Sequence, residues 1–221
     1  MQEDADENRR WKVAYDWIKD AIDSGRFAMG TPLRENELAR EIGISRTPVR
    51  EALHRLEGVN YVTITPLKGA FVADVSLEDL REIYEIRKLL EPFAALSSAL
   101  RIPDVEIDKM EKGWLELKKV AETNGIVDLT RVSAMDLQLH MNIINYSTNK
   151  RIASIIKRYD AQIRRFQKMS AQSRSNDKDT IGQHLEILAT MRSRDAKKLS
   201  ELLYSHIAKS ESNIMKEYYL R

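Results

Sequence analysis

Four side chains in the later part of the sequence have the types and the spacing of a metal site. Asp136 and His140 are separated by one helical turn, so both point to the same side of a helix. His184 and His206 each fall on the apolar stripe of a later helical stretch. All four side chains are therefore expected to point into the interior of a helical bundle.

A shared metal ion explains these residues better than separate burial does. A single histidine on an apolar face is more often a hydrogen-bonded core residue than a ligand. Burying three imidazoles and a carboxylate apart from one another would, however, incur several desolvation penalties, whereas one divalent cation satisfies them jointly. We therefore predict one divalent transition metal per chain, held by Asp136, His140, His184 and His206. A nitrogen-rich site favours Zn, Ni, Co or Fe over Mg or Ca, and Zn or Ni are the first candidates.

Arg87 is a candidate for binding an organic anion beside this metal. It falls in the apolar stripe of its helical stretch, so its planar guanidinium is expected to face the same cavity and to bind a carboxylate. With one carboxylate ligand, the divalent ion would keep a net charge of about +1 and attract an anionic oxygen. The alternative is an ion pair with Glu91, four residues on. The sequence leaves both interpretations open.

A second group of residues has the chemistry of a DNA contact. Ser45 is a good N-cap whose hydroxyl can accept a free backbone N–H, and Pro48 falls in the first helical turn, where its missing N–H costs nothing. A helix is therefore expected from about Arg46. Its first turns carry Arg46, Thr47 and Arg50. These side chains donate to phosphates and base edges at the end of the helix that a helix-turn-helix inserts into the major groove.

The neighbouring stretches predict the elements that would position this helix. Glu35–Ile42 is predicted as a short supporting helix, followed by a left-handed glycine turn. Two β-rich runs, 61–65 and 70–74, flank a turn in which Lys68 lies within reach of a phosphate. The amphipathic stretch from Asn8 to Ser24 would close a small core. Isolated arginines on a helix are most often a solvated face, but this order of elements favours DNA binding.

Composition limits the class of protein. The chain has 221 residues, 43% of them hydrophobic, and a formal net charge of +2, so it can bury a core and is neither strongly acidic nor strongly basic. It has no cysteine, which excludes disulfides and thiolate metal sites. No apolar run approaches the ~20 residues of a membrane span, and the acidic first residues do not resemble a signal peptide. A cytoplasmic protein without a membrane partner is expected.

From residue 76 onward the pattern is helical throughout. Short polar or proline-containing breaks separate six expected helices, as in an antiparallel bundle. Their approximate ranges are 76–101, 103–123, 126–146, 149–170, 177–193 and 195–219. The predicted fold is therefore mostly α-helical. An N-terminal winged helix-turn-helix with a small β-hairpin wing occupies 1–75, and an all-α six-helix antiparallel bundle occupies 76–221.

The first of these domains resembles a known family. Residues 32–39 (Pro-Leu-Arg-Glu-Asn-Glu-Leu-Ala), 45–56 (Ser-Arg-Thr-Pro-Val-Arg-Glu-Ala-Leu-His-Arg-Leu) and the Lys-Gly pair at 68–69 are similar to the winged helix of GntR-family transcription regulators. The resemblance implies operator contacts by Arg34, Arg46, Thr47, Arg50 and Gly69. The full set of candidate DNA-binding residues is Arg34, Ser45, Arg46, Thr47, Arg50, Lys68 and Gly69.

The second domain resembles the FCD ligand-binding domain of the same regulators. Its Asp-x3-His pair and two later histidines match the metal ligands of that domain, and six helices suggest its VanR-like branch. The resemblance also favours a role for Arg87 in binding the effector. The expected protein is a homodimer that binds a palindromic operator in double-stranded DNA and responds to a small carboxylate or sugar-acid effector. We expect a repressor of a catabolic operon and not an enzyme. The alternative, an all-helical metal-dependent hydrolase, leaves the winged helix unexplained.

Overall fold

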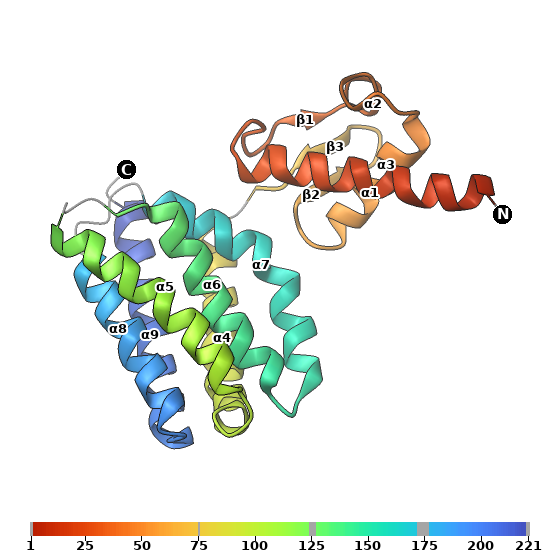
Figure 1. The fold of residues 1–221 in the computed structure, drawn as a ribbon. Helices are drawn as coiled ribbons and strands as arrows, with labels where there is room; N and C mark the ends of the chain where they lie inside the picture. The colour runs from red at the N-terminus through yellow and green to blue at the C-terminus, as the bar shows by residue number, and fades with distance from the viewer. Residues whose placement is uncertain (1, 75, 124–126, 172–176, 220–221) are drawn as a thin grey trace. The chain divides into compact units, whose positions relative to one another are not determined.

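The chain folds into two compact units. The structure, a computed structural model, describes residues 2–74, 76–123, 127–171 and 177–219. The first unit is formed mainly by residues up to Ser76 and the second mainly by residues from Leu77 onward. Among the described residues, the first unit combines helices with a small sheet and the second contains helices alone (Figure 1). The predicted fold class, a winged helix-turn-helix followed by a helical domain, is confirmed.

The first unit contains a helix-turn-helix. Its described elements are α1 (Gln2–Asp23), β1 (Pro32–Leu33), α2 (Glu35–Ile42), α3 (Arg46–Glu57), β2 (Val62–Thr65) and β3 (Gly69–Val72). Between α2 and α3, Gly43 has a φ of 78°, a left-handed conformation that glycine adopts without steric cost. Its N–H and that of Ile44 both donate to the carbonyl of Ala39 and so close the end of α2. The glycine turn therefore sets where α3 begins.

The sheet is antiparallel and has the strand order β1-β3-β2. Strands β2 and β3 form the predicted hairpin, with Val62 opposite Val72. Strand β1, which the sequence analysis did not predict, pairs Leu33 with Ala70. A strand of two residues is too short to show any alternation of apolar and polar side chains, so only its pairing with β3 reveals it.

The core of the first unit lies between α1, α3 and the sheet. Ile18 and Ile22 of the predicted apolar stripe on α1 are buried, whereas Trp11 and Tyr15 are half-buried. The buried cluster consists of Ala14, Ile18, Ile22, Leu33, Leu38, Ala39, Val49, Ala52, Leu53, Leu56, Tyr61, Val62 and Val72. Both helices of the helix-turn-helix contribute to it, so the core determines how α3 presents its outer face.

The second unit contains the six predicted helices. Their bounds are α4 (Leu77–Ser98), α5 (Asp104–Thr123), α6 (Leu129–Tyr146), α7 (Lys150–Ala171), α8 (Asp177–Arg192) and α9 (Ala196–Tyr219). Local signals place some of these ends. The side chain of Asp128, for example, accepts hydrogen bonds from the N–H groups of Thr130 and Arg131 and caps α6.

Helix α4 is central to the packing of this unit. It packs against both α9 and α6, while α5 packs against α8 and α8 against α9 (Figure 1). Its buried face is not purely apolar, because Arg87 and Glu91 are both buried there. This packing brings four helices, α4, α6, α8 and α9, around one polar cluster. Within the described residues, no helix combines the length and the apolar character needed to cross a membrane.

Candidate metal centre and DNA-contact face

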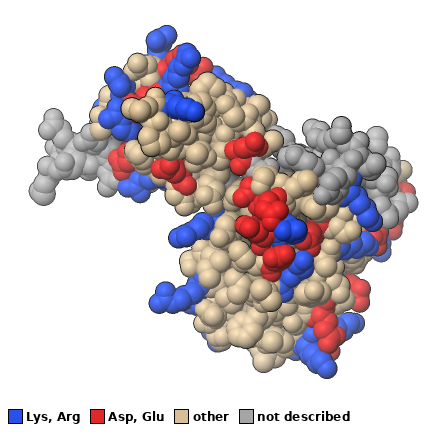
Figure 2. All heavy atoms as spheres, turned by 180° about the vertical axis from the view of Figure 1, so that it is seen from behind, with Lys and Arg blue, Asp and Glu red and all other residues tan. Residues whose placement is uncertain are grey.

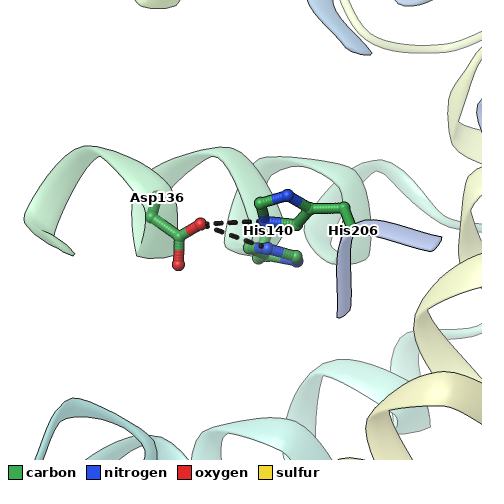
Figure 3. A group of neighbouring side chains, drawn as sticks. All are labelled: Asp136, His140 and His206. Carbon is green, nitrogen blue, oxygen red and sulfur yellow. Dashed lines mark hydrogen bonds and ion pairs between the residues drawn. The ribbon is translucent and has the colours of Figure 1, made fainter. Parts of the chain in front are cut away.

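The four predicted metal ligands meet inside the helical unit. Asp136 and His140 lie on α6, His184 on α8 and His206 on α9. The Nε2 atoms of His184 and His206 lie 2.8 and 3.1 Å from Asp136 Oδ1. The Nε2 atom of His140 lies 3.6 Å from the same oxygen, and Figure 3 shows His140 and His206 directed toward it. One carboxylate oxygen therefore faces three imidazole nitrogens.

The other nitrogen of each imidazole, Nδ1, contacts an oxygen outside this cluster. The pairs are His140 with Glu91 Oε2 at 2.5 Å, His184 with the Thr180 carbonyl at 2.7 Å, and His206 with Gln183 Oε1 at 3.3 Å. Both nitrogens of each ring therefore face an acceptor oxygen, and the tautomer that a metal at Nε2 would need keeps the hydrogen on Nδ1. A neutral imidazole has one N–H, so every Nε2 then presents a lone pair to Asp136.

Such a cluster of lone pairs requires a cation. All four side chains are buried, so bulk solvent does not screen the electron-rich atoms from one another. The Nε2 atom of His140 has no hydrogen-bond partner among the described residues. Ligand atoms of Asp136, His140 and His206 lie within 4.8 Å of one another, which is close enough for one ion to bind them together. These three residues therefore fit the predicted metal, and His184, whose Nε2 lies 2.8 Å from Asp136 Oδ1, stays a predicted fourth ligand.

Without a metal, a proton on His140 supplies part of the missing positive charge. Burial by itself lowers the pKa of His140, but the carboxylates of Glu91 and Asp136 outweigh this effect and raise the pKa to about 9. Burial also lowers the pKa of His206, and the hydrogen bond to Asp136 does not compensate, so that pKa falls to about 4. A metal ion must therefore compete with a proton on His140.

The pKa of Asp136 shows how strongly its surroundings favour the carboxylate. Burial alone would raise it, because a charged group is costly in the protein interior. The positive charge on His140 is the largest cause that lowers it, and the neighbouring imidazoles of His184 and His206 add to this, so the pKa of Asp136 lies well below its usual value instead. Asp136 is thus an anion at every pH at which the protein is expected to work, as a metal ligand must be.

Sequence reasoning missed Glu91 as a member of this site. The ion pair with Arg87 is present, with Arg87 Nε 2.6 Å from Glu91 Oε1. The other carboxylate oxygen of Glu91, however, contacts His140, and Glu91 is fully buried. Burial raises the pKa of Glu91, but Arg87 and His140 outweigh it and lower that pKa to about 2. The position of Glu91 one turn after Arg87 on the same helix face was the only signal in the sequence.

Trp114 of α5 forms one wall of the site. Its indole is fully buried and stacks on the imidazole of His184, with ring centroids 3.8 Å apart and an interplanar angle of 13°. This contact covers a face of the ring and leaves both nitrogens of His184 to their in-plane partners. No chemistry was predicted for Trp114, because a tryptophan on an apolar stripe is most often a core residue.

The predicted DNA-binding residues of α3 lie on its exposed side. Arg46, Thr47 and Arg50 are all exposed. Glu35 of α2 forms ion pairs with Arg46 and Arg50. Arg50 Nε and Nη2 lie 2.8 Å from Oε1 and Oε2 of Glu35, and Arg46 Nη2 lies 3.4 Å from Oε2. Two guanidinium groups are therefore gathered at one place on the surface, with donors suited to phosphate and guanine.

The prediction for the hydroxyl of Ser45 is wrong. Ser45 is the N-cap of α3, with extended backbone angles, but its side chain makes no capping hydrogen bond. The usual donor to such a hydroxyl is the N–H of the second or third helical residue. Here the third helical residue is Pro48, which has no N–H. Ser45 is exposed, so its hydroxyl faces solvent at the N-terminus of α3.

The remaining predicted DNA-binding residues are also on the surface. Arg34, just before α2, is exposed and forms an ion pair with Glu37. Lys68 and Gly69 lie in the exposed turn between β2 and β3, where Gly69 has a φ of 94°. The same turn exposes Leu67 completely, and this leucine has a left-handed φ of 65°. The hairpin thus ends in a tip with one free-standing apolar and one basic side chain.

Comparison with known families assigns both units. The family described as "Bacterial regulatory proteins, gntR family" matches residues 12–72, and the FCD domain matches residues 82–209. The chain belongs to the GntR family of regulators with an FCD domain. As a GntR-family member it is a DNA-binding transcription regulator and not an enzyme. The metal-dependent hydrolase that the histidines alone left open is therefore not favoured.

Characterised GntR-family proteins match over most of the chain. The Nta operon transcriptional regulator of Aminobacter aminovorans is 28% identical over 192 residues, which cover 87% of this chain and 88% of that protein. The transcriptional repressor RspR of Escherichia coli is 24% identical over 85% of this chain and 81% of its own length. The gluconate operon transcriptional repressor of Bacillus subtilis is 33% identical over 60% of this chain and 53% of its own.

Solved GntR-family structures share the fold. McbR/YncC of E. coli has a TM-score of 0.78 and 20% identity, covering 95% of this chain and 98% of its own. A putative GntR regulator from Rhodococcus sp. RHA1 gives a TM-score of 0.77, also with 20% identity. At this level of identity the likeness establishes the arrangement of elements and not the ligands.

Proposed function

We propose that this GntR-family regulator is a metal-containing homodimeric repressor whose operator affinity is set by a small carboxylate. The observation that carries the proposal is the meeting of three imidazole Nε2 lone pairs and one carboxylate oxygen in a buried site. Each of these imidazoles also faces an acceptor at Nδ1, so the one N–H of a neutral ring cannot satisfy both contacts, whereas a divalent ion at Nε2 can. The relatives of this chain include an operon regulator and two repressors, which supports repression of a catabolic operon.

One divalent transition ion per chain would be bound by Asp136, His140, His184 and His206. Because three of these four ligands are nitrogens, Zn or Ni is favoured. When bound, the metal supplies a Lewis-acidic centre that attracts anionic oxygen ligands. The chain's own residues align the imidazoles through their Nδ1 contacts and exclude water by burial.

The metal is tested on the purified protein. Elemental analysis should find about one transition metal per chain, and His184→Ala should lose it together with part of the thermal stability. The matched control is His54→Ala, since His54 is the one histidine outside the site and is exposed on α3. Equal metal content in the two variants, or none in the wild type, would refute the metal site.

Arg87 is proposed to bind the effector carboxylate. Its guanidinium is buried and is joined to the ligand His140 through Glu91, which places it beside the centre. The alternative role, an ion pair that holds α4 together, is supported by the same contact with Glu91. An effector would therefore have to share or replace that contact.

The effector is sought by thermal stabilisation of the metal-loaded protein against a panel of carboxylic and sugar acids, because a ligand of the folded state raises stability by mass action. A compound that stabilises should change operator affinity by 5- to 150-fold, the usual span of ~1 to 3 kcal/mol of coupling. Arg87→Ala should abolish the response while DNA binding without effector stays near normal. If Arg87→Ala instead unfolds the protein, the role of Arg87 is structural, in its ion pair with Glu91, and the effector binds to other residues.

A homodimer is supported by an apolar stripe on the outer face of α4 and just beyond it. The stripe has helical spacing and consists of Leu89, Phe93, Leu96 and Leu100, which are 73%, 59%, 44% and 69% exposed. From the side opposite to the view of Figure 1, uncharged side chains cover a broad area of the helical unit (Figure 2). Leucine and phenylalanine exposed in a row are typical of a surface that another protein covers. A second copy would bury the same stripe symmetrically and set two α3 helices for a palindromic operator.

A further inference from the structure

We propose that Glu91 is a positioning residue of the metal centre: its carboxylate orients His140 for the metal and ties α4 to the site. The proposal rests on the metal site argued above. It goes beyond that site because Glu91 is not one of the proposed ligands. Neither the spacing of the histidines nor the ion pair with Arg87 requires that Glu91 touch the ligand set.

Glu91 divides its two oxygens between two partners. Oε1 accepts from Arg87 Nε at 2.6 Å, and Oε2 accepts from His140 Nδ1 at 2.5 Å. All three side chains are at least 97% buried, so bulk solvent does not compete for these contacts. A hydrogen bond to Nδ1 selects the tautomer with a free Nε2 and stops the ring from turning about its axis. The free Nε2 of His140 is the atom that then faces Asp136.

The charge of Glu91 makes this support stronger than that of the other two histidines. His184 and His206 donate to neutral oxygens, the carbonyl of Thr180 and the amide of Gln183. A carboxylate acceptor increases the electron density on the imidazole and so strengthens it as a metal ligand. Arg87 is needed as a counter-charge, since a buried carboxylate without a cationic partner would be costly.

Glu91 also connects the centre to a different helix. The outer partners of His184 and His206 both lie on α8, whereas the partner of His140 on α6 lies on α4. Helix α4 carries Glu91 on its buried face and the exposed apolar stripe on the other. Among the contacts of the described residues, the Glu91–His140 pair therefore links metal occupancy directly to the helix proposed to form the dimer.

The test separates the acceptor from the charge. Removing Glu91 alone would strand a buried guanidinium, so both members of the ion pair are changed together. Arg87→Met with Glu91→Gln keeps an acceptor opposite His140, whereas Arg87→Met with Glu91→Leu removes it. The control is Lys88→Met with Glu211→Leu, which deletes an ion pair of 2.6 Å that also joins α4 to a neighbouring helix.

Affinity for Zn²⁺ is measured by competition with a chelator, and Co²⁺ serves as an optical probe of the ligand geometry. The Leu-containing variant should bind Zn²⁺ about 10- to 100-fold more weakly than wild type and show altered Co²⁺ absorption bands. The Gln-containing variant, which keeps the acceptor but not the charge, should lose less affinity than the Leu-containing variant, and the Lys88/Glu211 control should stay close to wild type. Melting of the metal-free proteins shows whether each variant is folded.

Three results would overturn the proposal. They are wild-type affinity and spectrum in the Leu-containing variant, an equal loss in the Gln-containing variant, and an equal loss in the Lys88/Glu211 control. If the Leu-containing variant does not fold, Glu91→Asp replaces it. That change keeps the charge but withdraws the oxygen from His140, so it should weaken Zn²⁺ binding, and wild-type affinity would again refute the role. Absence of metal from wild type is a different failure, that of the proposed function.

Discussion

Metal binding to the chelator-treated protein should release a proton from His140. The Nε2 atom of His140 must be unprotonated to bind a metal, yet Glu91 and Asp136 raise its pKa to about 9 in the metal-free site. At pH 7.5 the Nε2 atom of His140 therefore carries a proton in addition to the one on Nδ1, and the metal must displace it. His206, whose pKa is about 4, carries no such additional proton at that pH and adds nothing to the count.

The magnitude follows from linkage. Release of one proton makes the metal association constant rise about tenfold for each pH unit, which corresponds to ~1.4 kcal/mol per unit. The sign is set by His140: affinity increases with pH up to about 9, where the imidazole is already free, and then levels off. The rise should be present at pH 7 to 8, where a histidine with an ordinary pKa would no longer be protonated.

Calorimetric titration with Zn²⁺ in two buffers of different ionisation enthalpy counts the protons released. The variant with Arg87→Met and Glu91→Gln is the informative comparison, because Glu91 is the largest cause that raises the pKa of His140. Its proton release at pH 7.5 should be smaller than that of wild type. No proton release in wild type, together with an affinity that is flat between pH 7 and 9, would show that the electrostatic reasoning about this site is wrong.

Four further predictions concern stability, DNA and assembly. Metal-free protein should lose stability as the pH rises from about 6.5 through 9, because a raised pKa in the folded state makes protonated His140 a stabilising group, and thermal melts at successive pH values measure this loss. Arg50→Ala should weaken operator binding by about 1 to 3 kcal/mol in a gel-shift titration, and an unchanged affinity would remove α3 from base recognition. Lys68→Ala should mainly reduce the slope of log affinity against log salt by about one, since it offers a phosphate contact. Phe93→Glu, in the centre of the exposed stripe, should shift the protein from dimer to monomer in sedimentation experiments, and a persistent dimer would place the interface elsewhere.

The sequence by itself determined the helices and the types of residue available to the site. The glycine turn at Gly43 and the proline in the first turn of α3 are local signals, so they locate the helix-turn-helix without knowledge of the fold. The spacing of Asp136 and His140 by one turn already places both side chains on one face of a helix. The apolar stripes also place His184 and His206 on buried faces, and the cost of burying three imidazoles and a carboxylate separately predicts one shared metal ion.

The tertiary structure decided which atoms meet. Three contacts illustrate this, because each depends on distances and side-chain rotamers. They are the hydrogen bond from His184 to the Thr180 carbonyl, the contact of Glu91 with His140, and the ion pair of Glu35 with Arg50. Two of these contacts join different helices, whose packing no local periodicity encodes. Even the capping hydroxyl of Ser45 was a local prediction that failed, and Pro48 removes one of its two usual donors. Patterns along a chain report which face a residue occupies, but the pairing of donors and acceptors exists only once the helices are packed together.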